Sequence, residues 1–468
     1  MSETYKLLID GRRVDGISEF PVVNPATGLA FASAPKADEK QVDAAISAAG
    51  NAFKHWSSTS FAVRSAALIG IANALAERSA EFARTLTLEQ GKPLESAAAE
   101  VGYAVAMLKG FAKFELQPKV LRDQDEVRIT EHRFPLGVVA AITPWNYPIS
   151  LLMGKVGPAL VSGNTLVIKP APTTPLTTLM FGELCSHFLP PGVLNVIADE
   201  GDMGDYLTSH PGIAKISLTG STATGKRVMA NASSTLKRLT LELGGNDAAL
   251  VLDDIAAEEV APALFRGAMM NSGQVCLAIK RAYVPDAIYD DVCDELSRLA
   301  DEAIVGDGLE QGTQYGPLQN SKQFERVQGF LEEADRCGSV LSGGKVLDRP
   351  GFFVRPTIVR DIADDTRLVR EEQFGPILPV LRYTDIEDAL HRINDTPYGL
   401  GGTIWTSDPG KGEHLAARIE AGVVWVNKHL DIPIDLPLRA AKQSGMGTKY
   451  GLEGVEDYTQ AVLVNVKK

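Results

Sequence analysis

Cysteine is scarce in this chain, which has four in 468 residues. They stand at Cys185, Cys276, Cys293 and Cys337, with no CxxC pair and no histidine partner at ligand spacing. Disulfide frameworks and zinc sites need clustered ligands, so this scatter argues against both. We expect reduced thiols, no metal cofactor and a cytoplasmic location.

The chain also lacks a positive charge excess and a long apolar run. Its formal net charge is −13, which argues against a nucleic-acid or anionic-membrane partner. No apolar segment is long enough to cross a bilayer, and the opening residues MSETYKLLIDGRR contain no apolar signal core. The length suggests roughly two to four domains.

Helical periodicity dominates the first part of the chain. Apolar residues recur every three or four positions from about residue 38 to Trp56, and again from Leu68 to Phe82. A third helix is expected from Leu94 to about Phe114. The segment 120–135 instead alternates apolar and charged residues, which predicts an exposed two-stranded ribbon whose edges pair with another subunit.

From 137 to 243 short β-branched runs alternate with helical stretches. The runs are GVVAAIT, TLVIK, VLNVI, AKISLT and RLTLEL. They predict an open, mostly parallel sheet, whose ligands bind beyond the carboxyl ends of the strands. A second α/β region is expected from about 245 to 440, and the tail AVLVNVKK reads as one more strand.

Three polar residues have the chemistry of an acyl-transfer site. Cys276, in NSGQVC, is either a nucleophile or a buried structural thiol. Glu242, in LELGGN, is either a general base with a raised pKa or a residue at a strand end. Asn146, in PWNYP, is either an oxyanion donor or a turn asparagine.

Other strand ends suit a dinucleotide. Lys169 ends the run TLVIK and is either a nucleotide ligand or a lysine at the rim. In TGSTATGK, Gly220 permits close backbone approach and Ser221 begins a helix whose free N–H groups suit a pyrophosphate. Glu371 or Glu372, before QFGP, offers a carboxylate for a ribose diol, and the alternative is an ordinary acidic loop.

Together, in this order and spacing, these segments resemble the aldehyde dehydrogenase superfamily from about residue 20 to the end. LELGGN with a cysteine 34 residues later, followed by EExFGP, carries most of the resemblance. It implies an α/β fold with a Rossmann-type NAD(P)-binding domain (1–115 and 136–244) and an α/β catalytic domain (245–440). A small β oligomerisation arm and a C-terminal strand (116–135 and 441–468) would join a homodimer or homotetramer.

The resemblance also implies roles for the residues above. Cys276 would attack an aldehyde, Asn146 and the Cys276 N–H would form the oxyanion hole, and Glu242 would activate the water that hydrolyses the thioester. Lys169 would bind the adenosine ribose, Ser221 the pyrophosphate and Glu372 the nicotinamide ribose. The implied NAD or NADP contacts are Thr143, Trp145, Lys169, Pro172, Gly220, Ser221, Glu372 and Phe374, and the implied substrate pocket contains Tyr147, Gly154 and Arg439.

Two departures from the family pattern concern cofactor and substrate choice. Many relatives that prefer NAD have a glutamate where this chain has Pro172, so NADP becomes plausible. A glycine pair before a late lysine is replaced in LRAAK. Arg439 in this segment either binds a substrate carboxylate or pairs with Asp431 or Asp435.

Two further departures lie near the base. A late glutamate sometimes assigned to a proton relay is replaced by Lys449, which leaves Glu242 as the sole base. Some relatives carry a bulky aromatic residue where this chain has Gly154, before Lys155. Its loss predicts a wider tunnel that accepts bulky or aromatic aldehydes.

Three alternatives remain at this stage. In a CoA-acylating semialdehyde dehydrogenase the base is typically absent, so Glu242 favours hydrolysis. A non-catalytic binding protein on the same scaffold would be expected to lose Cys276, Glu242 or Asn146. An esterase that uses the same cysteine needs no nucleotide.

Overall fold

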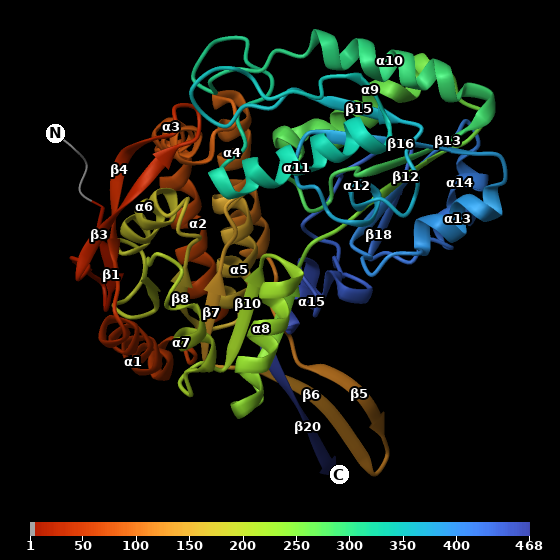
Figure 1. Ribbon diagram of the computed structural model, residues 1–468. Helices are drawn as coiled ribbons and strands as arrows, with labels where there is room; N and C mark the ends of the chain where they lie inside the picture. Colours follow the sequence, from red (N-terminus) through yellow and green to blue (C-terminus); the bar gives the residue numbers. More distant parts are fainter. Residues whose placement is uncertain (1–4) are drawn as a thin grey trace.

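Residues 5–468 are described by a computed structural model, in which two α/β bodies lie side by side and a narrow β arm projects from them (Figure 1). The first body contains the N-terminal helices and one large sheet, and the second contains most of the chain after residue 247. Among the described residues no helix combines the length and apolar character needed to cross a membrane.

The N-terminal helices follow the expected periodicity with one correction. The first begins with a capping box, in which Asp38 accepts from the Gln41 N–H and the Gln41 side chain accepts from the Asp38 N–H. The single helix predicted from Leu68 to Phe82 is wrong, because the backbone leaves the helical region at Arg78 (φ −98°, ψ 13°) and two helices result. The helices are α1 (Glu39–Trp56), α2 (Phe61–Glu77), α3 (Ser79–Gln90) and α4 (Leu94–Phe111).

The first sheet has eight strands in the order β19-β11-β10-β7-β8-β9-β1-β2. Its five consecutive strands from β11 to β9 are the five predicted from sequence, and all pair in parallel. The short antiparallel strands at its edges were not predicted. The strands are β1 (Leu7–Ile9), β2 (Arg12–Val14), β7 (Val138–Ile142), β8 (Thr165–Lys169), β9 (Leu194–Val196), β10 (Lys215–Thr219), β11 (Arg238–Glu242) and β19 (Gly445–Met446).

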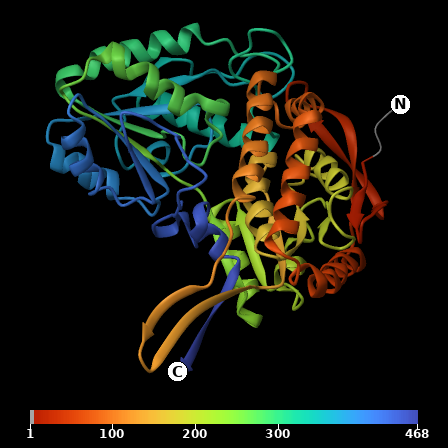
Figure 2. The same cartoon turned by 180° about the vertical axis from the view of Figure 1, so that it is seen from behind.

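Helices cover this sheet and share its apolar core. Figure 2, from behind, shows α2 and α4 (orange) running together along the body. The strands β3 and β4 form a separate antiparallel hairpin, which was also not predicted from sequence and which flanks α3. The remaining elements are β3 (Ser18–Asn24), β4 (Leu29–Lys36), α5 (Pro148–Val161), α6 (Leu176–Cys185), α7 (Gly204–Ser209), α8 (Thr222–Ala232) and α15 (Gly451–Glu456).

The second sheet has seven strands in the order β14-β15-β16-β13-β12-β17-β18, parallel except for β14. Successive residues of β12 face opposite cores, with Leu250 in one cluster and Val251 in the other. The strands are β12 (Ala248–Val251), β13 (Arg281–Pro285), β14 (Ser339–Ser342), β15 (Thr357–Arg360), β16 (Ile377–Tyr383), β17 (Gly401–Trp405) and β18 (Val423–Val426). The helices are α9 (Ala257–Met269), α10 (Tyr289–Glu302), α11 (Ser321–Cys337), α12 (Arg367–Arg370), α13 (Ile386–Asn394) and α14 (Pro409–Ala416).

The arm confirms the predicted ribbon and adds the C-terminal strand to it. β5 (Lys119–Gln124) and β20 (Thr459–Lys467) both pair antiparallel with β6 (Val127–Pro135). The arm extends away from both bodies in Figures 1 and 2. Its exposed apolar side chains are Val120, Leu121, Phe134, Val462, Leu463, Val464 and Val466.

Candidate active site

Cys276 lies in a loop that follows α9 and turns sharply. Three consecutive residues before it, Asn271, Ser272 and Gly273, have φ of 51°, 55° and 73°, a region that glycine tolerates best. A Cβ on Gly273 would lie 2.1 Å from the carbonyl oxygen of Gly375. The glycine therefore lets the NSGQVC loop touch the QFGP segment, and two motifs distant in sequence meet through their backbones.

A cavity of about 190 Å³ is lined in part by Cys276. It collects residues that follow β7, β10 and β11, as expected where strands of a parallel sheet end. The lining residues are Pro144, Trp145, Asn146, Thr219, Gly220, Ser221, Leu243, Gly244, Cys276, Gln323, Arg326, Glu372 and Phe374. Most of the predicted cofactor contacts thus meet Cys276 and Asn146 around one space.

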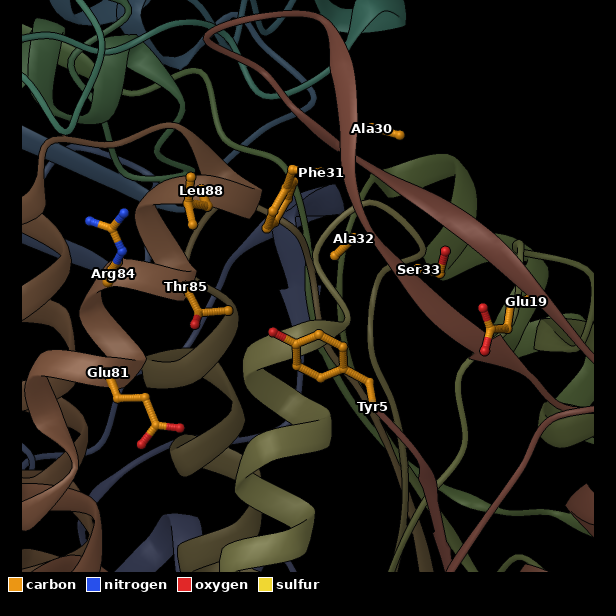
Figure 3. A pocket seen from close by; sticks show the side chains of 10 residues that line it. All are labelled: Tyr5, Glu19, Ala30, Phe31, Ala32, Ser33, Glu81, Arg84, Thr85 and Leu88. Carbon is orange, nitrogen blue, oxygen red and sulfur yellow. The ribbon is translucent and has the colours of Figure 1, made fainter. Parts of the chain in front are cut away.

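A larger hollow, about 680 Å³, lies between the β3–β4 hairpin and α3 (Figure 3). It shares no lining residue with the Cys276 cavity, and its lining contains no cysteine, histidine or asparagine. Size is therefore a poor guide here, and the chemistry assigns the candidate site to the smaller cavity. The hollow is lined by Tyr5, Glu19, Ala30, Phe31, Ala32, Ser33, Glu81, Arg84, Thr85 and Leu88.

Asn146 is fixed at both its side chain and its backbone. Its Nδ2 donates to the carbonyl oxygen of Gln274 (2.9 Å), two residues before Cys276. Its own carbonyl accepts from Lys92 Nζ (3.0 Å) and from Asn271 Nδ2 (3.1 Å). An amide held in this way has one N–H left to point at a reacting oxygen, as an oxyanion donor requires.

Lys92 and Glu100 support Asn146, and sequence reasoning missed both. They form a fully buried ion pair, and Lys92 Nζ also lies 3.7 Å from the centroid of the Tyr147 ring. Glu100 Oε1 accepts from the N–H groups of Ile149 and Ser150 (3.1 Å each), in the first turn of α5. No local signal marks this pair, because a lysine and a glutamate in an N-terminal helical region read as surface charges.

Glu372 packs against the GGN segment. Its Oε1 accepts from the Gly245 N–H (3.0 Å) and lies 4.0 Å from Lys280 Nζ. A Cβ on Gly244 would come within 2.3 Å of Oε2, so this glycine makes room for the carboxylate. Burial raises the pKa of Glu372.

The same cavity offers binding groups for one half of a dinucleotide and for its pyrophosphate. Phe374 and Trp145 meet edge to face, with ring centroids 5.2 Å apart, and Glu372 supplies a carboxylate beside them. Ser221 Oγ caps α8 by accepting from the Thr224 N–H (3.1 Å), so the positive helix end faces the cavity through Gly220 and Ser221. These residues fit a flat ring, a ribose diol and a pyrophosphate.

Lys169 and Pro172 do not line this cavity, and Lys169 has an acidic partner that sequence reasoning missed. Lys169 Nζ lies 2.6 Å from Asp199 Oδ1, and both side chains are buried. Asp199 Oδ2 accepts from the Met203 N–H (2.7 Å). Asp199 follows β9, so the order of the strands, and not its place in the sequence, brings it to Lys169. Thr143, next to the end of β7, is buried and donates its N–H to the Lys169 carbonyl (3.1 Å).

Glu242 ends β11 but its carboxylate does not line the Cys276 cavity. Lys449 Nζ donates to Glu242 Oε2 (2.9 Å), and both residues line a separate small cavity behind β11. Lys155 of α5 lines the same cavity and donates to Thr219 Oγ1 (2.8 Å). The base candidate is therefore paired with a cation in a cavity that shares no lining residue with the Cys276 cavity.

The vacant space expected beside Gly154 is filled. A Cβ there would lie 3.1 Å from Lys449 Cε and 3.4 Å from the Tyr450 ring. The missing side chain thus admits Lys449, and the wider tunnel inferred from Gly154 is wrong for this reason. The space beside Gly154 is thus set by residues about 300 positions away in the sequence.

The resting thiol of Cys276 is protonated. Burial, followed by the negative charge of Glu242, raises its pKa to about 12, while Lys280 and Lys449 oppose the shift. Lys280 Nζ also donates to the carbonyl oxygens of Val275 (2.9 Å) and Cys276 (2.7 Å). Loss of the thiol proton is therefore opposed first by burial and second by the charge of Glu242.

The residues predicted around the substrate separate into two groups. Tyr147 and Cys276 pack on one apolar cluster, which also contacts Leu430, Ile432 and Ala440. Arg439 is half-exposed and pairs with Glu453, so the predicted pairing with Asp431 or Asp435 is wrong. Among residues 5–468 no group of three or more His, Cys, Asp or Glu side chains is arranged to hold a metal ion.

Comparison with known proteins gives a consistent picture. The model of the Aldehyde dehydrogenase family matches residues 13–464. Succinate-semialdehyde dehydrogenase (NADP+) of Escherichia coli is 35% identical over 97% of this chain and 96% of its own length. Phenylacetaldehyde dehydrogenase of Pseudomonas fluorescens is 36% identical over 97% of this chain and 94% of its own length. The NAD+ complex of an aldehyde dehydrogenase from Bacillus cereus superposes with a TM-score of 0.97 at 34% identity, covering 99% of this chain and 97% of that one.

Proposed function

This chain belongs to the aldehyde dehydrogenase family and oxidises aldehydes to carboxylic acids with NAD(P), and from this premise we propose that Cys276 is its nucleophile, Asn146 its oxyanion donor and Glu242 its general base. The observation that carries the proposal is that Cys276 and Asn146 share a cavity with Glu372 and the start of α8. A thiol, an amide donor and a dinucleotide-binding surface then meet at one point.

The chemistry follows from these positions. Once the Cys276 thiol has lost its proton to solvent water, its sulfur attacks the aldehyde carbon, and the negative charge that builds on oxygen is stabilised by the free N–H of Asn146 and by the Cys276 N–H. Bound NAD(P) would accept the hydride that leaves the former aldehyde carbon. Loss of this hydride would leave a thioester on Cys276. Glu242, once turned from Lys449, takes a proton from the water that hydrolyses this thioester.

The decisive experiment combines two variants and two measurements. We expect Cys276→Ala to bind NAD(P) but to form no NAD(P)H with any aldehyde, and Glu242→Gln to give one rapid burst of NAD(P)H per site followed by slow turnover. Intact mass after the burst should show one acyl group on Cys276. Full turnover by Cys276→Ala would overturn the proposal, and CoA-dependent release of the acyl group would favour the acylating alternative.

For the substrate we propose an aldehyde with an apolar or aromatic body. The support is the apolar cluster that packs against Cys276 and Tyr147, together with the ion pair that engages Arg439. Acetaldehyde, succinate semialdehyde and phenylacetaldehyde, each with NAD and with NADP, form a discriminating panel. A higher kcat/KM for succinate semialdehyde than for phenylacetaldehyde would contradict this choice.

We also propose a homodimer or homotetramer built through the arm, in the cytoplasm. The arm exposes a row of apolar residues on β20, including Leu463 (60% exposed), which is costly for a free surface. Leu463→Asp should lower the mass measured by light scattering, whereas Lys40→Asp on α1 should not. The four unpaired cysteines agree with a reducing compartment.

A further inference from the structure

Lys449, which has no part in the proposed reaction, forms an ion pair with the proposed general base, Glu242. Lys449 Nζ lies 2.9 Å from Glu242 Oε2, and the two side chains are 6% and 11% exposed. A buried ion pair of this kind fixes the direction of both side chains, because separation leaves an uncompensated charge. The pair spans 207 residues of sequence, so only the fold creates it.

The surroundings of Lys449 are built to keep it there. Its backbone exchanges two hydrogen bonds with Leu438 (2.7 and 2.9 Å). Gly154 leaves space for its side chain on the α5 side, where a Cβ would lie 3.1 Å from Lys449 Cε. The ion pair, the backbone hydrogen bonds with Leu438 and the space beside Gly154 therefore all favour one position of the Lys449 ammonium group.

Other titratable groups also surround Glu242. They are Lys155 of α5, Cys276, Tyr450 and Tyr458. Burial, followed by repulsion from Lys449, lowers the pKa of Lys155 to about 7. Burial also acts to lower the pKa of Lys449, but Glu242 and Tyr450 outweigh it and raise that pKa. Lys449 is therefore the permanent positive charge beside Glu242 at neutral pH.

We propose that Lys449 is a positioning residue for the hydrolytic half of the reaction, which holds the Glu242 carboxylate in the ion pair until the thioester forms. The inference rests on the proposed roles of Glu242 and Cys276. The ammonium attracts the charged form of a carboxylate and has no such attraction for the protonated form. The same attraction must be broken before Glu242 reaches the water at the thioester.

The test is the pH profile of thioester hydrolysis, measured as steady-state turnover after the NAD(P)H burst. The acidic limb of this profile is the pH range in which turnover falls as the pH decreases. Lys449→Gln keeps a hydrogen-bond donor without the charge, and Lys449→Arg keeps the charge. We expect Lys449→Gln to retain the burst amplitude while the acidic limb moves up by about one pH unit or more. At pH values below the limb, its turnover relative to the plateau should fall about tenfold. Lys449→Arg should restore the wild-type limb.

Controls separate this effect from general damage. Lys40→Met on α1 should leave the profile unchanged, and the thermal midpoint of every variant shows whether it folds. In a Glu242→Gln background, Lys449→Gln should produce no further shift, because the lysine acts through the carboxylate. If Lys449→Gln does not fold, Lys449→Met, which also removes the charge, should move the limb in the same direction.

The outcomes are distinguishable. An acidic limb that stays in place in folded Lys449→Gln, or in folded Lys449→Met, overturns the role of Lys449. Wild-type enzyme that shows neither a burst nor an acyl group on Cys276 overturns the proposed function itself.

Discussion

Asp199 and Lys169 form a buried ion pair at the carboxyl edge of the first sheet, with 2.6 Å between Oδ1 and Nζ. Lys169 is the residue that the family resemblance assigns to the adenosine ribose. Sequence alone offered Pro172 at the usual acidic position and therefore left NADP plausible. The pair supplies a carboxylate after all, from the loop that follows β9.

This relationship predicts the cofactor preference. The Asp199 carboxylate neutralises Lys169 and repels a 2′-phosphate, so we expect NAD to bind more tightly than NADP. Asp199→Ala should shift the ratio of dissociation constants towards NADP by at least about tenfold, or ~1.4 kcal/mol. Fluorescence titration with each dinucleotide measures the ratio. The neighbouring Asp202→Ala is the matched control, and an unchanged ratio in Asp199→Ala would limit Asp199 to a structural role.

The oxyanion donor gives a second prediction. Asn146→Ala should lower kcat by about 10²–10³-fold, the usual effect of removing one such donor. Dinucleotide affinity should change little, because the amide faces the reacting carbonyl. Stopped-flow recording of the NAD(P)H burst isolates the affected step, and Asn51→Ala on α1 serves as the control. A burst rate equal to wild type would remove Asn146 from the oxyanion hole.

The buried pair beneath Asn146 predicts a loss of stability. Lys92→Met leaves Glu100 charged and unpaired, which typically costs about 3–5 kcal/mol of unfolding free energy. Urea unfolding curves measure the loss. The double variant Lys92→Met/Glu100→Gln should recover part of it, because no buried charge is then left alone. Additive losses in the double variant would show that the two side chains do not act as a pair.

The thiol of Cys276 predicts a pH dependence without substrate. Its pKa is raised to about 12, so the reactive thiolate is scarce at neutral pH and increases as pH rises towards that value. Alkylation of Cys276 by iodoacetamide, followed by peptide mass analysis, should accelerate with pH through 9 and 10 without a plateau. Glu242→Gln removes the negative charge that opposes the thiolate, so it should speed alkylation at a fixed pH.

Exposed Cys337 in the same digest provides the internal reference for this experiment. A plateau near pH 7 for Cys276 would mean that the thiol is already activated in the resting protein.

The sequence determined the elements and the chemical groups of this protein, because both depend on local patterns. The helical spacing of apolar residues and the capping residues at the start specified α1. Runs of β-branched residues specified the strands β7 to β11. The motifs around Cys276, Glu242 and Asn146 carry the groups that we propose take part in the reaction. The break at Arg78 was missed since the apolar spacing continues across it while the backbone changes direction.

Only the tertiary structure decided how these groups are charged and supported. Asp199 reaches Lys169, Glu100 reaches Lys92 and Lys449 reaches Glu242 through contacts between segments that no local pattern relates. Packing beside Gly154 likewise depends on residues distant in sequence, because a missing side chain leaves a void only if no other residue occupies the space. Electrostatics and packing depend on distances in space, which the order of residues along the chain does not contain.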